Sequence, residues 1–154
     1  MWQTVEEFAS WYKANNMPMR PPKDDPVYVT EISMSYVLFR DGQFQAELYL
    51  VKPNTGSPQH SHPGIENIIM LMGGDITLED KLGARLSPPK GMDIFGLLGS
   101  TIRNGETHAL LCGDKGGAFL SLEKWEDGIK PTSVTIRWEG ETCGDSHTAL
   151  VDVS

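Results

Sequence analysis

Turn-forming residues interrupt this chain so often that little room is left for long helices. Sixteen glycines and ten prolines are scattered through 154 residues. Because glycine and proline punctuate local structure, this distribution favours many short elements joined by turns. From residue 27 onward, the segments between turns are short and rich in β-branched and aromatic side chains, which is typical of strands. The pattern predicts an all-β sandwich or barrel.

One hairpin in this region can be placed from its turn. Asp41-Gly42 is a strong short hairpin signal, because both residue types tolerate a positive φ. The segment 44–51 then alternates, with Phe44 on an apolar face and Gln45 on a more polar one. The other predicted strands are 27–31, 34–40, 66–72, 75–79, 84–87, 92–96, 107–112, 117–124, 133–138 and 148–153.

The first residues have a different pattern, which predicts a short helix. Thr4 and Glu7 form a T-x-x-E capping box. The apolar side chains that follow recur at helical spacing, up to a proline-rich connector. We therefore expect one domain, with a helix and connector at 1–26 and a β-barrel at 27–154.

Charge and hydropathy exclude several classes of protein. The formal net charge of −8 repels nucleic-acid phosphates and anionic membrane surfaces, so we expect neither as a partner. No apolar stretch approaches the ~18 residues of a membrane helix, and the acidic N-terminus lacks the features of a signal peptide. The two cysteines lack CxxC spacing and suit reduced thiols. We expect a cytoplasmic protein.

Two of the four histidines stand one residue apart. On a strand, His60 and His62 point to the same side, so both imidazoles can reach one ion. Glu66 follows a Pro-Gly turn that can direct it back to the same centre. His108 lies far along the chain and joins them only if its strand is adjacent. Three imidazoles and one carboxylate suit a borderline divalent metal such as Fe, Mn, Co, Ni or Zn.

The spacing around this pair resembles the first motif of the cupin family, G-x5-H-x-H-x3,4-E-x6-G. Residues 54–73 match it at four positions: His60, His62, Glu66 and Gly73. The leading glycine is replaced by Asn54. Asparagine is enriched at positive φ, so the turn can be kept.

Residues 97–112 resemble a degraded second cupin motif, G-x5-P-x-G-x2-H-x3-N. Gly105 and His108 match the pattern. The first glycine, the proline and the asparagine of the motif are replaced by Leu97, Arg103 and Cys112. The second motif thus keeps its metal ligand.

The resemblance implies a double-stranded β-helix, or cupin jelly-roll barrel, with a metal inside one end. The metal ligands it implies are His60, His62, Glu66 and His108. Fe(II) is the expected metal, with Mn, Ni, Co or Zn as alternatives. By the same analogy, we expect a homodimer.

Strand alternation suggests which side chains line the metal pocket. Met70 shares a face with Glu66, while Leu110 and Cys112 share one with His108, so these are candidate substrate-binding residues. Met70 and Leu110 could equally be barrel core. Cys112 could be a pocket thiol or a buried small hydrophobic residue.

Two polar side chains are further candidates for the site. Tyr49 or Glu66 could remove a proton from a bound substrate. Arg103, beside the second motif, could bind an anionic substrate bidentately, although an exposed loop arginine is the alternative.

Three functions remain open. The resemblance implies a metal-dependent enzyme acting on a small molecule, either a dioxygenase or a redox-neutral lyase or isomerase in which the metal is a Lewis acid. The alternative is a non-catalytic cupin that binds a metal and a small ligand for storage or sensing. The fold does not decide between them.

Overall fold

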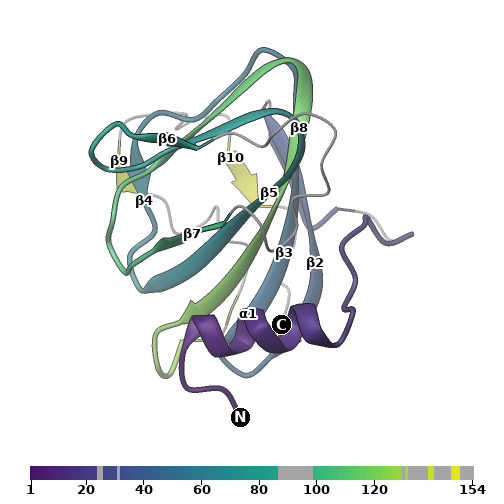
Figure 1. The fold of residues 1–154 in the computed structure, drawn as a ribbon, viewed down its shortest axis with the longest axis vertical. Coiled ribbons are helices and arrows are strands. Elements are labelled where there is room, and N and C mark those ends of the chain that lie inside the picture. The colour runs from purple at the N-terminus through teal and green to yellow at the C-terminus, as the bar shows by residue number, and fades with distance from the viewer. Residues whose placement is uncertain are drawn as a thin grey trace.

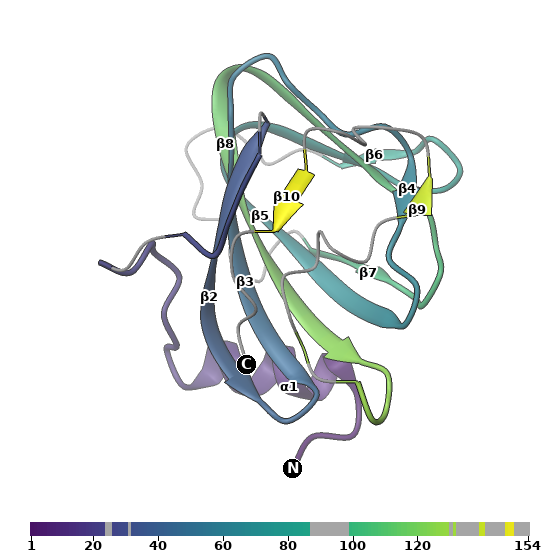
Figure 2. The same cartoon turned by 180° about the vertical axis from the view of Figure 1, so that it is seen from behind.

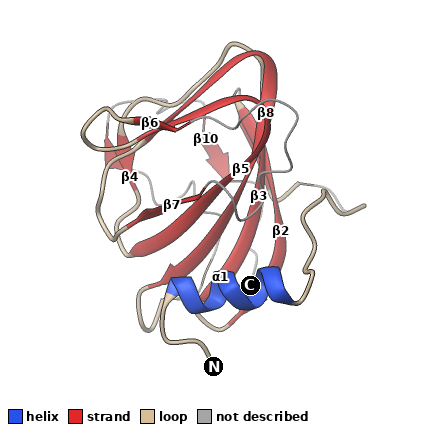
Figure 3. Cartoon of the chain, viewed as in Figure 1, coloured by secondary structure: helices blue, strands red, loops and turns tan. Residues whose placement is uncertain are grey.

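The predicted all-β architecture with one N-terminal helix is confirmed (Figures 1 and 3). The computed structural model describes residues 1–23, 26–30, 32–86, 99–129, 131, 139–140 and 147–149. Its elements are α1 (Val5–Ala14), β1 (Tyr28–Thr30), β2 (Ser33–Asp41), β3 (Phe44–Val51), β4 (His60–Ser61), β5 (Ile65–Glu79), β6 (Arg85–Leu86), β7 (Gly99–Ile102), β8 (Ala109–Trp125), β9 (Glu139–Gly140) and β10 (His147–Ala149).

The strands form one large sheet and one small one. The 8-stranded sheet has the order β10-β1-β2-β3-β8-β5-β6, and β7 also pairs with β5. The second sheet pairs β4 with β9. Figures 1 and 2 both show β4 and β9 on the far side of the barrel from β2 and β3. This arrangement places His60, in β4, on the wall of the barrel opposite the hairpin of β2 and β3.

The N-terminal helix begins where the capping box predicted. Thr4 Oγ1 accepts a hydrogen bond from the Glu7 backbone N–H at 3.1 Å, and Glu7 Oε2 accepts one from the Gln3 N–H at 2.9 Å. The helix lies in front of the sheet in Figure 1 and behind it in Figure 2, so it covers one face. Its buried residues are Val5, Phe8, Ala9 and Tyr12. In the described part of the chain, no helix is long and apolar enough to span a membrane.

The hairpin at Asp41-Gly42 is confirmed, but two pairs of predicted strands prove to be single strands. Gly42 has φ +59°, and β2 pairs with β3 on either side of the turn. β5 joins the predicted strands 66–72 and 75–79, and β8 joins 107–112 and 117–124. Their glycines do not end the strands, because the ladder between β5 and β8 continues past them with two register shifts.

The remaining strand predictions meet the structure only in part. The segments 92–96 and 133–138 lie outside the described residues. Of 148–153, residues 148–149 are described and belong to β10. The short strands β4, β7 and β9 were not predicted, because each is too short to show a period.

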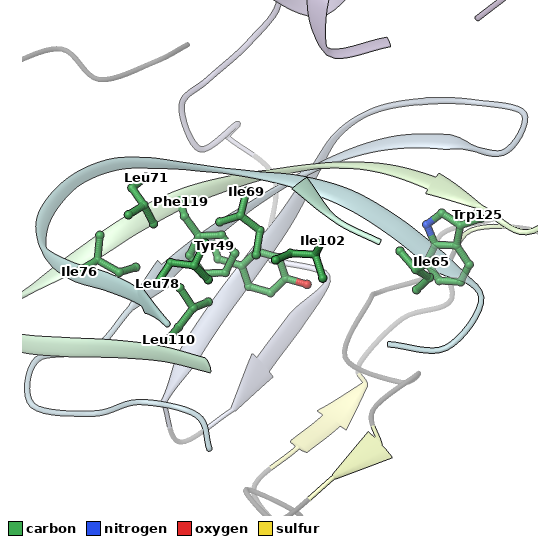
Figure 4. Close-up of a cluster of buried hydrophobic side chains, with 10 residues drawn as sticks. All are labelled: Tyr49, Ile65, Ile69, Leu71, Ile76, Leu78, Ile102, Leu110, Phe119 and Trp125. Carbon is green, nitrogen blue, oxygen red and sulfur yellow. The ribbon is translucent and has the colours of Figure 1, made fainter. Parts of the chain in front are cut away.

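The central strands are buried on both faces. The inner face contributes a cluster of buried side chains, the inner cluster, which includes Tyr49, Ile65, Ile69 and Phe119 (Figure 4). The outer face packs against α1. There Phe44 and Leu48 of β3 form a second cluster, the outer cluster, with buried side chains of the helix such as Phe8. Alternation along β3 therefore turns its more polar side chains into the barrel, where Gln45, Glu47 and Tyr49 are all buried: 0%, 0% and 5% exposed.

Candidate metal centre

A backbone bridge places two of the histidines directly opposite each other. The His60 N–H donates to the His108 carbonyl, and the His108 N–H donates to the His60 carbonyl, both at 2.9 Å. Opposed residues of a β-bridge project their side chains to the same side. The bridge thus brings together two imidazoles that are far apart in the chain.

His62 completes a cluster of three buried imidazoles. The ring centroids lie 4.9 Å apart for His60 and His62, 4.4 Å for His60 and His108, and 5.4 Å for His62 and His108. One nitrogen from each residue lies within 4.8 Å of the others. The residues His60, His62 and His108 are 2%, 8% and 2% exposed. The predicted meeting of these three residues is confirmed.

One hydrogen bond sets the tautomer of His60, and burial favours the neutral form of His108. His60 Nδ1 lies 2.7 Å from the Pro58 carbonyl oxygen, so Nδ1 carries the proton and Nε2 the lone pair. Burial lowers the pKa of His108 to about 4, although Glu106 partly opposes this shift. A neutral imidazole needs no deprotonation before it binds a metal.

A cavity of about 50 Å³ adjoins the three rings. Its apolar wall includes Tyr49 and Phe119, whose rings stack with centroids 4.6 Å apart and planes at 5°. No Asp, Glu, Lys or Arg is among its described lining residues. The cavity is lined by Ile32, Ser33, Tyr49, Val51, Gly56, Ser57, His60, His62, Asn67, Ile69, His108, Leu110, Phe119 and Ser121.

Solved structures share this arrangement of strands. KdgF from Halomonas sp. aligns with a TM-score of 0.56 at 13% identity, covering 69% of this chain and 90% of that one. The polyketide cyclase RemF from Streptomyces resistomycificus gives 0.52 at 17% identity, over 74% and 88%. A sugar phosphate isomerase from a cupin superfamily, from Silicibacter pomeroyi, gives 0.50 at 20% identity, over 67% and 63%. This chain has the cupin fold.

The likeness to these cupins is structural. No protein-family model matches the sequence, and no curated protein matches it either. Asn54 has φ +58°, so it takes the conformation expected at the leading glycine of the first cupin motif. Its backbone N–H donates to the Gly113 carbonyl at 2.9 Å. The turn of the motif is therefore preserved without the glycine.

The structure does not bring Glu66 to the three histidines. β5 starts at Ile65, whose side chain belongs to the inner cluster, so Glu66 points to the outer face. There its Oε1 lies 3.2 Å from Nη1 of Arg103. Among the described residues, the group that could hold a metal ion is therefore three histidines, without the predicted carboxylate.

Arg103 and Met70 also lie outside the cavity. Arg103 is half-exposed and contacts both Glu66 and Glu6, the latter at 2.7 Å. These two carboxylates raise the pKa of its guanidinium, with Glu66 having the larger effect. Met70 packs against the outer cluster beneath α1. Neither is placed to contact a ligand beside the histidines.

Three other predicted residues are buried, and two of them line the cavity. Tyr49 and Leu110 both contribute to its wall. Cys112 is a free, buried thiol whose Sγ lies 3.9 Å from the carbonyl oxygen of Val51, and Cys112 itself is not among the residues that line the cavity. Burial raises the pKa of this thiol, and Asp75 adds to the effect. Cys112 therefore matches the alternative of a small hydrophobic core residue. Cys143 lies outside the described residues.

Sequence reasoning missed the polar side chains of the cavity. Asn67 and Ser121 both line it, and Asn67 Nδ2 donates to Ser121 Oγ at 2.9 Å. Ser57 Oγ accepts from the Leu110 N–H at 3.1 Å. The available signal was alternation: Asn67 lies two residues after Ile65, on the opposite face from Glu66. Using that signal required knowing which face of β5 points inward.

Proposed function

We propose that this cupin is a metal-dependent enzyme that acts on a small organic molecule, with the metal held by His60, His62 and His108. The observation that supports the proposal is the convergence of three buried imidazoles at the edge of a cavity. The residues fit such an ion, because imidazole nitrogens suit divalent transition metals. We expect Fe(II), with Mn, Ni, Co or Zn as alternatives.

A bound metal would act as a Lewis acid on a ligand oxygen or, for iron, support chemistry with dioxygen. The chain's own residues set which ligand fits. Three neutral imidazoles do not offset the charge of a divalent ion, and the described cavity wall has no charged side chain. An anionic group on the ligand would provide that charge. We therefore propose a small organic anion as the substrate class.

The cavity residues would orient such a molecule. Tyr49 and Phe119 form a flat stacked wall against which a planar or apolar portion can lie. Asn67 and Ser121 present hydrogen-bonding groups on the same cavity. This combination of an apolar wall with a few polar groups is typical of small-molecule sites. It supports a ligand-binding role over a metal that serves structure alone.

Metal analysis tests the proposal directly. We expect about one equivalent of transition metal in protein purified without added metal, and a large loss in His108→Ala. His147→Ala is a matched control, because it removes the remaining histidine, which lies on β10. If the wild type neither carries nor takes up a transition metal, the proposed function is wrong.

Reactivity then separates the two kinds of chemistry. Oxygen consumption by the Fe(II) protein with a panel of small organic acids would support a dioxygenase. Turnover of the same panel without oxygen, with Zn or Mn bound, would support a lyase or isomerase. A folded, metal-loaded protein that binds acids from the panel without converting any would instead support a storage or sensing cupin.

A further inference from the structure

A buried carboxyl group that the proposed metal site does not use lies inside the barrel, next to the cavity rather than on its wall. Glu123 of β8 is 0% exposed. It follows Ser121 by two residues on the same face of the strand, and Ser121 lines the cavity. Glu123 is itself absent from the cavity lining. Glu123 is thus the next residue on the same face of β8 after Ser121, which borders the space that a ligand would occupy.

Only one oxygen of this carboxyl group is used by the surrounding side chains. Glu123 Oε1 accepts hydrogen bonds from Gln45 Nε2 at 3.1 Å and from Trp125 Nε1 at 3.0 Å. Glu123 Oε2 is buried and has no hydrogen-bond partner among the described residues. A buried oxygen in this state is costly unless it carries a proton or gains a partner.

Burial and the nearby carboxyl of Glu47 disfavour the ionised form of Glu123, and hydrogen bonds from Trp125, Ser121 and Gln45 only partly oppose them. Among the described residues, no Lys, Arg or His side chain forms a hydrogen bond or an ion pair with it. The nearby carboxyl is Glu47, which lies opposite Ser121 in the ladder between β3 and β8. It accepts from Ser35 Oγ at 2.6 Å and from Gln45 Nε2 at 3.3 Å. Arg40 Nε donates to Gln45 Oε1, at 2.9 Å. Burial, and then the charge of Glu47, raise the pKa of Glu123 well above its usual value.

Ser121 connects this carboxyl group to the cavity. Its hydroxyl lies near enough to Glu123 to lower the pKa of the carboxyl group, against the larger effects of burial and Glu47. A serine hydroxyl has two acceptor lone pairs and one donor. Asn67 Nδ2 occupies one lone pair. If protonated Glu123 donates to the other lone pair, the Ser121 O–H must point elsewhere, and the cavity is the side on which a ligand can receive it.

We propose that Glu123 stores a proton for the cavity and exchanges it with a bound ligand through the Ser121 hydroxyl. The proposal rests on the proposed function for the ligand itself. In the forward step, the Glu123 Oε2–H bond breaks as its proton moves to Ser121 Oγ. At the same time the Ser121 proton moves to an anionic oxygen of the ligand. The products are a Glu123 carboxylate and a neutral ligand O–H, and no electrons are transferred.

The reverse step takes a proton from the ligand, and Ser121 then donates back to the carboxylate. The charge on Glu123 therefore decides whether Ser121 is a donor or an acceptor toward the cavity. Ser121 would contact the ligand directly. Glu123 acts through Ser121, and the hydrogen bonds from Gln45 to Glu123 and from Asn67 to Ser121 hold the two groups in this arrangement.

Infrared spectroscopy of the metal-free protein tests the proton and its link to Ser121. A protonated carboxylic acid gives a C=O band that is separate from the band of carboxylates. We expect this band in the wild type at pH 7, its loss in Glu123→Gln and a shift in its position in Ser121→Ala. Glu126→Gln, which removes an exposed carboxylate near the end of β8, should leave it unchanged.

The infrared result can overturn the proposal by itself. If the wild type shows no such band at pH 7, Glu123 holds no proton. If the band does not move in Ser121→Ala, the link to the cavity is absent. Should Glu123→Gln fail to fold, the comparison of wild type with Ser121→Ala still decides, because neither protein alters the carboxyl group.

Azide binding to the Co(II)-loaded protein tests the exchange with the cavity. The affinity should fall with rising pH as Glu123 ionises and Ser121 turns away from the anion. We expect this additional fall to be roughly 3- to 10-fold, the effect of one hydrogen bond. Glu123→Gln and Ser121→Ala should lose it, whereas Glu126→Gln should retain it. Any competition from hydroxide is common to all four proteins.

The two proposals can fail separately. If no metal binds, the proposed function is wrong, and the infrared band still tests Glu123. If cobalt and azide bind with the same pH dependence in the wild type and in Glu123→Gln, the metal site stands and the proton exchange is refuted.

Discussion

The role of a side chain in this barrel depends on the face of the strand from which it projects. Glu66 and Asn67 are neighbours in β5, yet Glu66 pairs with Arg103 outside while Asn67 bonds to Ser121 in the cavity. Successive residues of a strand alternate between faces, so a one-residue change in register would exchange their environments. This alternation explains why Glu66 is not among the candidate metal ligands.

Glu66→Gln should therefore leave the zinc affinity of the protein unchanged. His108→Ala should lower it by more than the roughly 10- to 100-fold typical of residues that merely support metal ligands, because it removes a ligand itself. Isothermal titration calorimetry with zinc compares the two variants with the wild type. A loss in Glu66→Gln as large as that in His108→Ala would restore Glu66 as a ligand. The ion pair with the half-exposed Arg103 should contribute little to stability.

The sequence was sufficient to predict the histidine cluster but not the position of Glu66. His60 and His62 share a face on any extended backbone, and the spacing around His108 fits a recognisable motif. Glu66 lies near the start of β5, a strand with apolar side chains on both faces: Ile65 and Ile69 on the inner face and Ile68 on the outer face. Period-2 patterns indicate the inner face only when the outer face is polar.

Among the secondary-structure elements, the two long strands β5 and β8 bend together while they remain paired. β5 and β8 remain paired from Ile65↔Trp125 to Glu79↔Ala109, and the register shifts twice around Gly73 and Gly74. Gly74 has φ +79°, and a Cβ there would lie 2.2 Å from the Gly116 carbonyl oxygen. The two backbones can approach this closely only because the position lacks a side chain.

Gly74→Ala should lower the free energy of unfolding by at least about 2 kcal/mol, because it combines backbone strain with a clash against backbone atoms. Gly73→Ala is a matched control: a Cβ there meets nothing within 4 Å. We expect it to change stability by no more than about 0.5 kcal/mol. Urea denaturation of both variants makes the comparison. Equal costs would show that the close approach at Gly74 does not constrain the bend.

The elements that sequence predicted well were those with local signals. Thr4 caps α1, and Gly42 turns the hairpin between β2 and β3, as expected from residues a few positions apart. The paired glycines at 73–74 were interpreted as a break between strands. Their actual role, a bend in a continuous ladder, depends on Gly116 across the sheet. A contact of that kind cannot be deduced from a local window.

At the scale of the whole molecule, the barrel has an apolar exterior on one side and a partly polar interior. α1 covers the outer face of the central strands, which allows their apolar side chains to project away from the barrel. The inner face is then free to hold Gln45, Glu47 and Glu123, each 0% exposed, beside the histidine cavity. The helix thus contributes to the site indirectly. It covers the apolar outer face of strands whose inner face also holds buried polar groups.

The stability of the metal-free protein should therefore depend on pH through Glu123. Its pKa is raised in the folded protein, whereas an unfolded chain gives glutamate about 4.3. Above about pH 4.3 the folded state therefore holds more protons, and stability falls as pH rises until the folded Glu123 ionises. His108, with a folded pKa of about 4, has the opposite slope, confined below its unfolded value of about 6.5. A decline measured from pH 6.5 to 9 in wild type that disappears in Glu123→Gln, by urea titration at each pH, would assign the effect to Glu123. Parallel profiles for the two proteins would mean that Glu123 ionises with equal ease in the folded and unfolded chains.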